Sequence, residues 1–198
     1  MALTGCNGIL GWTGMKFDEA RIVAVCARRG HHFSKSPQLL IRLVAGLGIE
    51  GDAHMGQTVK HLSRARKYPD MPNLRQVHLI DTGYTSLMKE RGFGLGPGDI
   101  GENMLVEGLD LISLPCDTRL KLGADGAVIR LTGLRNPCIQ MDRFMPGLMA
   151  ASLDRDDQGQ LIRRSGVMAV VESGGDVRAG ESLVVDLPPR PWRPLEPV

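Results

Sequence analysis

The segment 132–138 (TGLRNPC) carries the residues best suited to chemistry in this chain. An apolar run with strand character, residues 127–131, leads into it, and Pro137 cannot donate to a sheet ladder. We therefore expect the strand to stop there and to present Cys138 just beyond its end. A nearby guanidinium favours a thiolate, so Arg135 and Asn136 make Cys138 a candidate reactive cysteine. The alternative is a packed thiol, because free cysteines are among the most buried residues.

Asp52 and His54 form a second candidate pair. On an extended segment they project to one face, where a carboxylate and an imidazole could orient a ligand or accept a proton. The simpler alternative is an aspartate that caps a turn. The glycine pattern GxGxxG at residues 46–51 is not followed by the amphipathic helix that a dinucleotide-binding loop requires, so we do not assign it to a nucleotide.

Two further stretches offer binding groups. Segment 58–68 (TVKHLSRARKY) is the one concentrated basic stretch, and it is either a solvated face or an anion clamp, since guanidinium groups bind phosphate oxygens in pairs. Loop 95–103 is rich in glycine, which allows close backbone approach to a ligand. The candidates from these stretches are Lys60, His61, Arg64, Glu102 and Asn103.

Composition excludes several classes of protein. Aromatic residues make up only 4% of the 198 residues and the net charge is +2, which argues against nucleic-acid binding. No apolar run is long enough for a membrane span, and the N-terminus does not resemble a signal peptide. The four cysteines are widely spaced and form no CxxC pair. We therefore expect free thiols in the cytoplasm, with neither nucleic acid nor membrane as a partner.

The hydrophobic pattern predicts a mainly β fold. We count about eight short strands at near-regular spacing, and one convincing helix over residues 82–91 that Asp81 caps. This pattern favours a mostly antiparallel, closed or nearly closed β-barrel with a few short helices. We expect residues 1–20 to be a flexible extension, residues 21–187 to form the domain, and residues 188–198 to be a proline-rich tail.

Five motifs in this order resemble the MOSC domain, the C-terminal domain type of molybdenum-cofactor sulfurases. It also occurs in the mitochondrial amidoxime-reducing component and in small bacterial proteins. The motifs are GIEGDAH (48–54), RQVHLI (75–80), GPGDIGEN (96–103), TGLRNPC (132–138) and GVMAV (166–170). The resemblance covers about residues 21–187 and again implies a β-barrel.

The resemblance also implies roles for individual residues. Cys138 would be the family's key cysteine, a ligand of molybdenum in a bound molybdopterin cofactor or a carrier of sulfur. Asp52, His54, Asn103, Arg135 and Asn136 would line the pocket. We add Glu102 and Arg75 from the matching motifs as cofactor-binding candidates. The basic segment departs in length from the family, and its assignment to the cofactor phosphate rests on charge alone.

Four functions remain open at this stage. The first is a reductase of N-hydroxylated or N-oxide compounds, in which Cys138 holds the metal, Asp52 or His54 handles protons and an external donor supplies electrons. The second is a sulfur carrier or cofactor-binding module, in which Cys138 receives a persulfide from a cysteine desulfurase. The third is hydrolysis by a Cys138–His54 pair. The fourth is a structural zinc site of Cys138, His54 and Asp52.

Overall fold

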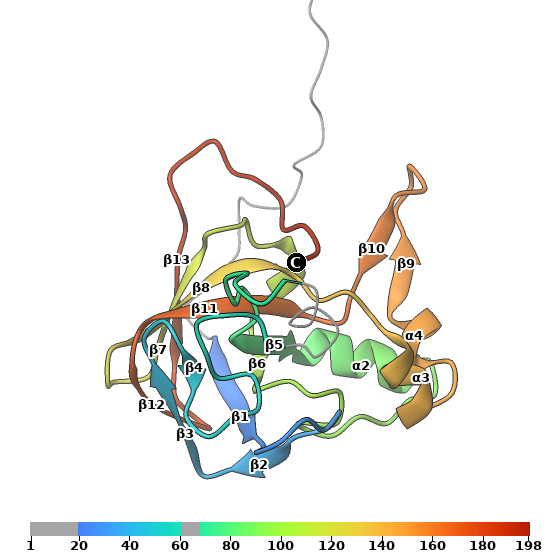
Figure 1. Cartoon of the computed structure of the whole chain (residues 1–198). Coiled ribbons are helices and arrows are strands. Elements are labelled where there is room, and N and C mark those ends of the chain that lie inside the picture. Colours follow the sequence, from blue (N-terminus) through green and yellow to red (C-terminus); the bar gives the residue numbers. More distant parts are fainter. Residues whose placement is uncertain (1–19, 61–67) are drawn as a thin grey trace, which may run out of the picture.

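The computed structural model of the chain describes residues 20–60 and 68–198, which form three sheets and a few short helices (Figure 1). The strands of the large sheet are β1 Arg21–Ala27, β2 Ser36–Gln38, β5 Val77–Asp81, β6 Met104–Glu107, β7 Arg119–Leu122, β8 Ala127–Leu134, β11 Val167–Ser173 and β13 Leu183–Asp186. The smaller sheets contain β3 Leu40–Val44, β4 Gly48–Ile49 and β12 Gly175–Arg178, and β9 Leu153–Arg155 with β10 Leu161–Arg163. The helices are α2 Thr82–Glu90, α3 Ile139–Phe144, α4 Leu148–Ala151 and the 3₁₀ turn η2 Leu111–Ser113.

The large sheet has the order β13-β7-β8-β11-β5-β6-β1-β2. Its neighbours are antiparallel except β5 and β6, which run parallel because α2 lies between them in the chain. Alternate residues of β8 face the core, as the sequence predicts for a half-buried strand. The central strand β11 pairs with β8 on one side and β5 on the other.

The prediction of a closed or nearly closed barrel is wrong. The eight-stranded sheet is open, with β13 and β2 as its edges, and no ladder within residues 20–60 and 68–198 joins the two. Backbone hydrogen bonds around an isolated bridge between Arg21 and Ser182 join the start of β1 to the residues at the start of β13, but they form no strand ladder that closes the sheet. The physical reason is that β3, β4 and β12 form a separate sheet, while β2 is a three-residue edge strand with a proline in it. The mainly β, mostly antiparallel character is confirmed.

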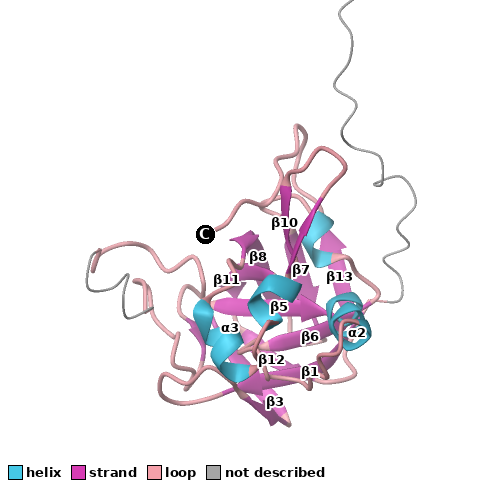
Figure 2. Cartoon of the chain, turned by 90° about the vertical axis from the view of Figure 1, so that its right-hand side faces the viewer, coloured by secondary structure: helices cyan, strands magenta, loops and turns pink. Residues whose placement is uncertain are grey.

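Two apolar clusters hold these layers together. The main core joins inward-facing residues of the large sheet to Ile41, Leu43 and Val177 of the small β12-β3-β4 sheet. The second lies beneath α2, α3 and α4, which gather on one side of the molecule (Figure 2). Asp81 caps α2 as predicted, since its carboxylate accepts from the Tyr84 N–H at 2.9 Å. The helical layer therefore covers one side of the sheet that carries the site.

Two peripheral segments return to the large sheet near the end of β8. The hairpin β9-β10 projects from the body after α4 (Figure 1). The C-terminal segment passes back over the molecule and meets β8 at Leu134, where a parallel bridge joins it to Pro197. None of the helices within the described part of the chain has the length and apolar content needed to cross a lipid bilayer.

Candidate functional site

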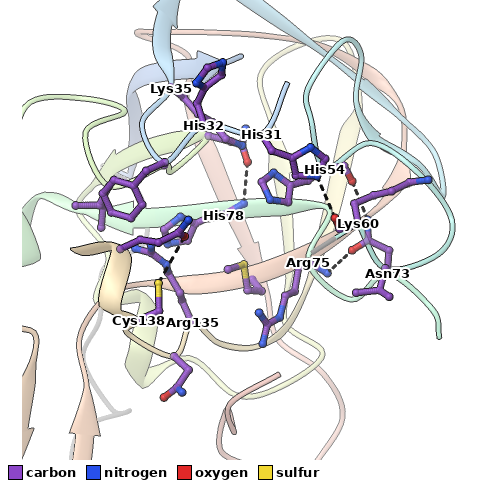
Figure 3. A pocket seen from close by; sticks show the side chains of 18 residues that line it. His31, His32, Lys35, His54, Lys60, Asn73, Arg75, His78, Arg135 and Cys138 are labelled. Atoms are coloured by element: carbon purple, nitrogen blue, oxygen red, sulfur yellow. Dashed lines mark hydrogen bonds between the residues drawn. The ribbon is translucent and has the colours of Figure 1, made fainter. Parts of the chain in front are cut away.

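A cavity of about 370 Å³ opens at the end of β8 (Figure 3). Six separate stretches of the described chain contribute to its wall, so the fold brings them together. Seven predicted residues line it: His54, Lys60, Arg75, Asn103, Arg135, Asn136 and Cys138. Asp52 and Glu102 are buried behind the wall. The predicted residues His61 and Arg64 lie outside the described residues.

Cys138 lies where the sequence predicts, just beyond the end of β8. Leu134 is the last strand residue and Cys138 immediately precedes α3. The thiol is half-buried and faces the cavity, with Gln140 Oε1 3.8 Å from Sγ. Two contacts fix the intervening backbone: the Arg135 N–H donates to Gly166 O at 3.0 Å, and Ser165 Oγ donates to Arg135 O at 3.1 Å. The sulfur is therefore held at the cavity wall and is not part of the apolar core.

Arg135 brings a buried positive charge to the same end of the cavity. Its Nη1 is buried and has no hydrogen-bond partner among the residues the structure describes. The guanidinium lies 5.8 Å from the centre of the Phe33 ring. Burial lowers the pKa of Arg135, while the proximity of Cys138, Tyr84 and Glu102 opposes that shift. A buried guanidinium nitrogen without a hydrogen-bond partner is costly, and an anionic ligand in the cavity would satisfy it.

Asp52 organises the opposite end without touching the cavity. Its Oδ2 lies 2.8 Å from Lys35 Nζ, and its Oδ1 accepts from the His54 backbone N–H at 3.0 Å. Burial by itself would raise the pKa of Asp52, but the hydrogen bond from His54 and the ion pair with Lys35 outweigh burial and hold this pKa well below its usual range. Asp52 is therefore an ionised acceptor that orients two cavity residues, Lys35 and His54.

The contact with Asp52 also selects the tautomer of His54. His54 Nδ1 lies 3.3 Å from Asp52 Oδ1, and an ionised carboxylate can only accept, so Nδ1 carries the proton. In the neutral ring Nε2 then has a free lone pair. His31 lies beside it, with ring centres 6.1 Å apart. This end of the cavity offers a proton acceptor next to the cation Lys60.

Asn103 and Glu102 have mainly internal roles in the structure. The Asn103 side chain accepts from the His78 N–H at 3.1 Å and donates to Cys26 O at 3.0 Å, so it ties β5 to β1 beneath the cavity. Glu102 Oε1 accepts from the Gly98 N–H, whereas Oε2 is buried without a partner within the described structure. Burial raises the pKa of Glu102. Their predicted part in cofactor binding stays a prediction.

The sequence analysis missed two buried residues of the cavity wall. Lys35 is 8% exposed although it lies in a polar loop, GHHFSKSP (30–37), where a lysine is normally exposed to solvent. His78 is buried on β5, and its Nε2 lies 2.8 Å from Ser165 O. Burial and the charge of Arg135 lower the pKa of His78 well below its usual range, so this ring is neutral and donates to Ser165 O. Alternation in RQVHLI puts His78 on the same strand face as Gln76, but only the tertiary fold brings that histidine to the cavity.

Two of the open functions find no support in this geometry. No group of three or more histidine, cysteine, aspartate or glutamate side chains within the described part of the chain is arranged to hold a metal ion, which removes the zinc centre of Cys138, His54 and Asp52. Figure 3 shows His54 and Cys138 on different sides of the cavity, and no hydrogen bond joins Cys138 to a histidine among the described residues. A Cys–His nucleophile needs that contact.

The fold and the cavity define a β-rich domain with a thiol at one end of a pocket that cationic side chains line. A family model for the MOSC domain matches residues 52–184, and the chain therefore belongs to the MOSC domain family. This family is associated with molybdenum cofactor binding.

Solved structures share the fold at low sequence identity. The YuaD protein from Bacillus subtilis has a TM-score of 0.69 at 22% identity, over 84% of this chain and 94% of YuaD. YiiM from Geobacillus stearothermophilus has a TM-score of 0.60 at 17% identity, over 85% and 75% of the two chains. YiiM from Escherichia coli has a TM-score of 0.55 at 18% identity, over 87% and 73%. A search of curated proteins finds no match.

Proposed function

We propose that this chain binds the molybdenum cofactor in the cavity and uses it to reduce N-hydroxylated or N-oxide compounds. The observation that carries the proposal is the pairing of a soft thiol, Cys138, with the buried and unpaired Nη1 of Arg135. A thiolate suits a soft metal centre, and a guanidinium suits an anionic pterin group. These residues fit the cofactor that the MOSC family is associated with.

Different residues along the cavity would have different roles in holding the cofactor. Cys138 would hold the metal, and Arg135 would neutralise the negative charge that the cofactor brings to that end. Lys60 and Arg75 are the cations on which we place the cofactor phosphate. Phe33, Ile100 and Met168 supply apolar wall, which keeps water from the reacting centre. When bound, the molybdenum centre would supply the two-electron chemistry.

His54 is the group that we assign to proton delivery. Reduction of an N-hydroxyl group consumes two electrons and two protons and releases water, with the N–O bond broken and an N–H bond formed. Asp52 holds the Nδ1 edge of the His54 ring, which points Nε2 away from the carboxylate and leaves it as the atom that would pass a proton to the substrate. Because the chain shows no electron-transfer motif, an external donor, in the cytoplasm, supplies the electrons.

Elemental analysis tests this proposal. The full chain is purified from a host that makes the cofactor, in parallel with Cys138→Ala and, as a matched control, Cys116→Ala. We expect close to stoichiometric molybdenum in the wild type and the control, and a large loss in Cys138→Ala. A wild-type protein that is folded by circular dichroism but contains no molybdenum above background would overturn the proposal.

The exposure of the cavity mouth favours a second function, transfer of sulfur. Cys138 is half-buried and its neighbour Ile139 is 56% exposed, so a partner protein could reach the thiol. In this reaction the Cys138 thiolate attacks the sulfane sulfur of a desulfurase persulfide. A new S–S bond forms on Cys138 and the donor thiol leaves, with no net oxidant. Mass spectrometry after incubation with the donor should find one added sulfur on Cys138, and a Cys138→Ser protein that still takes up sulfur would exclude this function.

A further inference from the structure

We infer that the C-terminal segment 193–198 is a positioning element of the cavity, which adds to the edge of β8 and fixes the strand end that carries Arg135 and Cys138. The strand β7 pairs with β8 only from Ala127 to Arg130. Farther along the same strand, the C-terminal segment takes over the pairing. The Leu134 N–H donates to Glu196 O at 2.8 Å, and the Val198 N–H donates to Leu134 O at 3.3 Å.

Other contacts anchor this segment along its length. Leu195 is 6% exposed and belongs to the main apolar core. Arg193 O accepts from the Cys116 N–H at 2.9 Å, and the Arg193 guanidinium lies 2.7 Å from Asp117 Oδ2. The segment thus combines an apolar anchor with backbone pairing, which is how an added strand is normally held.

The sequence of β8 is adapted to this contact at Gly133. A Cβ atom at position 133 would overlap Glu196 O and would lie within 3.0 Å of Val198 Cγ2. Any larger residue would therefore push the C-terminal segment off the strand. Gly133 lies only two residues before Arg135, so the close approach occurs directly beside the cavity.

The segment acts on the cavity through β8 alone, since none of its residues lines the wall. Leu134 is held by the C-terminal segment on one edge and by Val167 of β11 on the other. The next residue, Arg135, donates its N–H to Gly166 O at 3.0 Å. Loss of the outer support would let the strand end fray, and the inner bond of Arg135 would open more often. The inference holds whichever ligand the cavity binds.

Amide hydrogen exchange on the full chain tests the inference. Two variants release the segment: a deletion of residues 193–198, and Gly133→Ala. The Arg135 amide has no direct contact with the segment, so we expect its exchange to accelerate roughly fivefold or more, the ratio that one lost backbone hydrogen bond produces. The Val171 amide, bonded to Gln76 Oε1 toward the other end of β11, should not change. Glu196→Ala keeps the backbone carbonyl and should behave as the wild type.

Two cysteines report whether each variant is informative. Alkylation of Cys116, read by mass spectrometry, should accelerate when the segment leaves, because its N–H is bonded to Arg193 O. Cys26 is fully buried and should stay protected as long as the domain is folded. If the deletion exposes Cys26, the shortened domain is no longer folded, and the exchange rate of the Arg135 amide is then compared in Gly133→Ala. Faster labelling of Cys116 with unchanged exchange at Arg135 would overturn the inference.

Discussion

The ammonium of Lys35 lies 2.8 Å from Asp52 Oδ2, and the two side chains are 5% and 0% exposed. This ion pair joins the loop between β1 and β2 to the loop that follows β4. Burial lowers the pKa of Lys35, and the charge of Asp52 opposes that shift. Each partner therefore depends on the other, and removal of either leaves an uncompensated polar or charged group next to the cavity.

Asp52→Asn should destabilise the folded protein by about 3–5 kcal/mol, because Lys35 would remain buried without its counter-ion. Urea denaturation of the two proteins at neutral pH measures the difference. The matched control is Asp176→Asn, which breaks the surface pair with Arg42, whose side chain is 60% exposed. That variant should change stability little. Equal losses of unfolding free energy in both variants would show that the buried Lys35–Asp52 pair stabilises the fold no more than a surface pair does.

Glu102→Gln should stabilise the protein, and the gain should grow with pH. Burial raises the pKa of Glu102 in the folded state above the value of 4.5 for a free side chain. At a pH below that value the Glu102 carboxyl is protonated in both the folded and the unfolded protein, so it does not lower the free energy of unfolding. As the pH rises toward the folded-state pKa, the unfolded chain ionises first and the folded protein loses stability.

Glutamine stays neutral and keeps an acceptor for the Gly98 N–H. The unfolding free energies of Glu102→Gln and wild type should therefore be closest at about pH 4 and should separate by about pH 8. Denaturant titrations at the two pH values check this expectation. A difference that does not vary with pH would mean that Glu102 does not titrate as inferred.

Gly166→Ala should damage the fold where β11 meets the cavity. Gly166 has φ +93°, and a Cβ there would overlap Leu79 O and lie 3.0 Å from His78 Nε2. The expected cost is above about 2 kcal/mol, from left-handed strain and overpacking together. Gly159→Ala is the control, since Gly159 has φ +76° but open space around it and should cost only about 1 kcal/mol. Thermal unfolding distinguishes the two, and similar midpoints would contradict the expected clash.

Arg135→Met should separate stability from ligand binding. Methionine has a similar length but no charge to bury, so the ligand-free protein should be as stable as the wild type or more stable by about 1 kcal/mol. Inorganic phosphate should raise the unfolding temperature of the wild type, and it should raise that of the variant less, because the variant keeps Lys60 and Arg75 but loses the cation beside Cys138. Arg143→Met, at an exposed position on α3, should keep the response. A phosphate response of the same size in Arg135→Met and wild type would show that Arg135 takes no part in holding the anion.

The parts of the site that follow local rules could be predicted from the sequence. Pro137 ends the strand before Cys138, and Asp81 caps α2, because each effect acts within a few residues. Lys35 could not be predicted, since a lysine in a polar loop is buried only when a distant carboxylate meets it. The barrel prediction failed for a related reason. Alternation of apolar residues indicates strands, but it does not determine which edges pair.

The glycine pair where β11 gives way to β12 illustrates the same limit. Two adjacent glycines are typical of a turn, but a strand begins again at Gly175 and joins the small sheet. A Cβ at Gly174 would lie 2.7 Å from Leu43 O, so the glycine permits close contact between segments far apart in the chain. Nothing in the local sequence distinguishes that use from a simple loop.

The wall of the cavity is assembled from residues that begin at His31 and end at Met168. During synthesis, the ribosome therefore releases most of the chain before the last wall strand exists. Contacts of such long sequence separation also form slowly. A ligand of this cavity can therefore be enclosed only after β11 has been made and has folded into the wall.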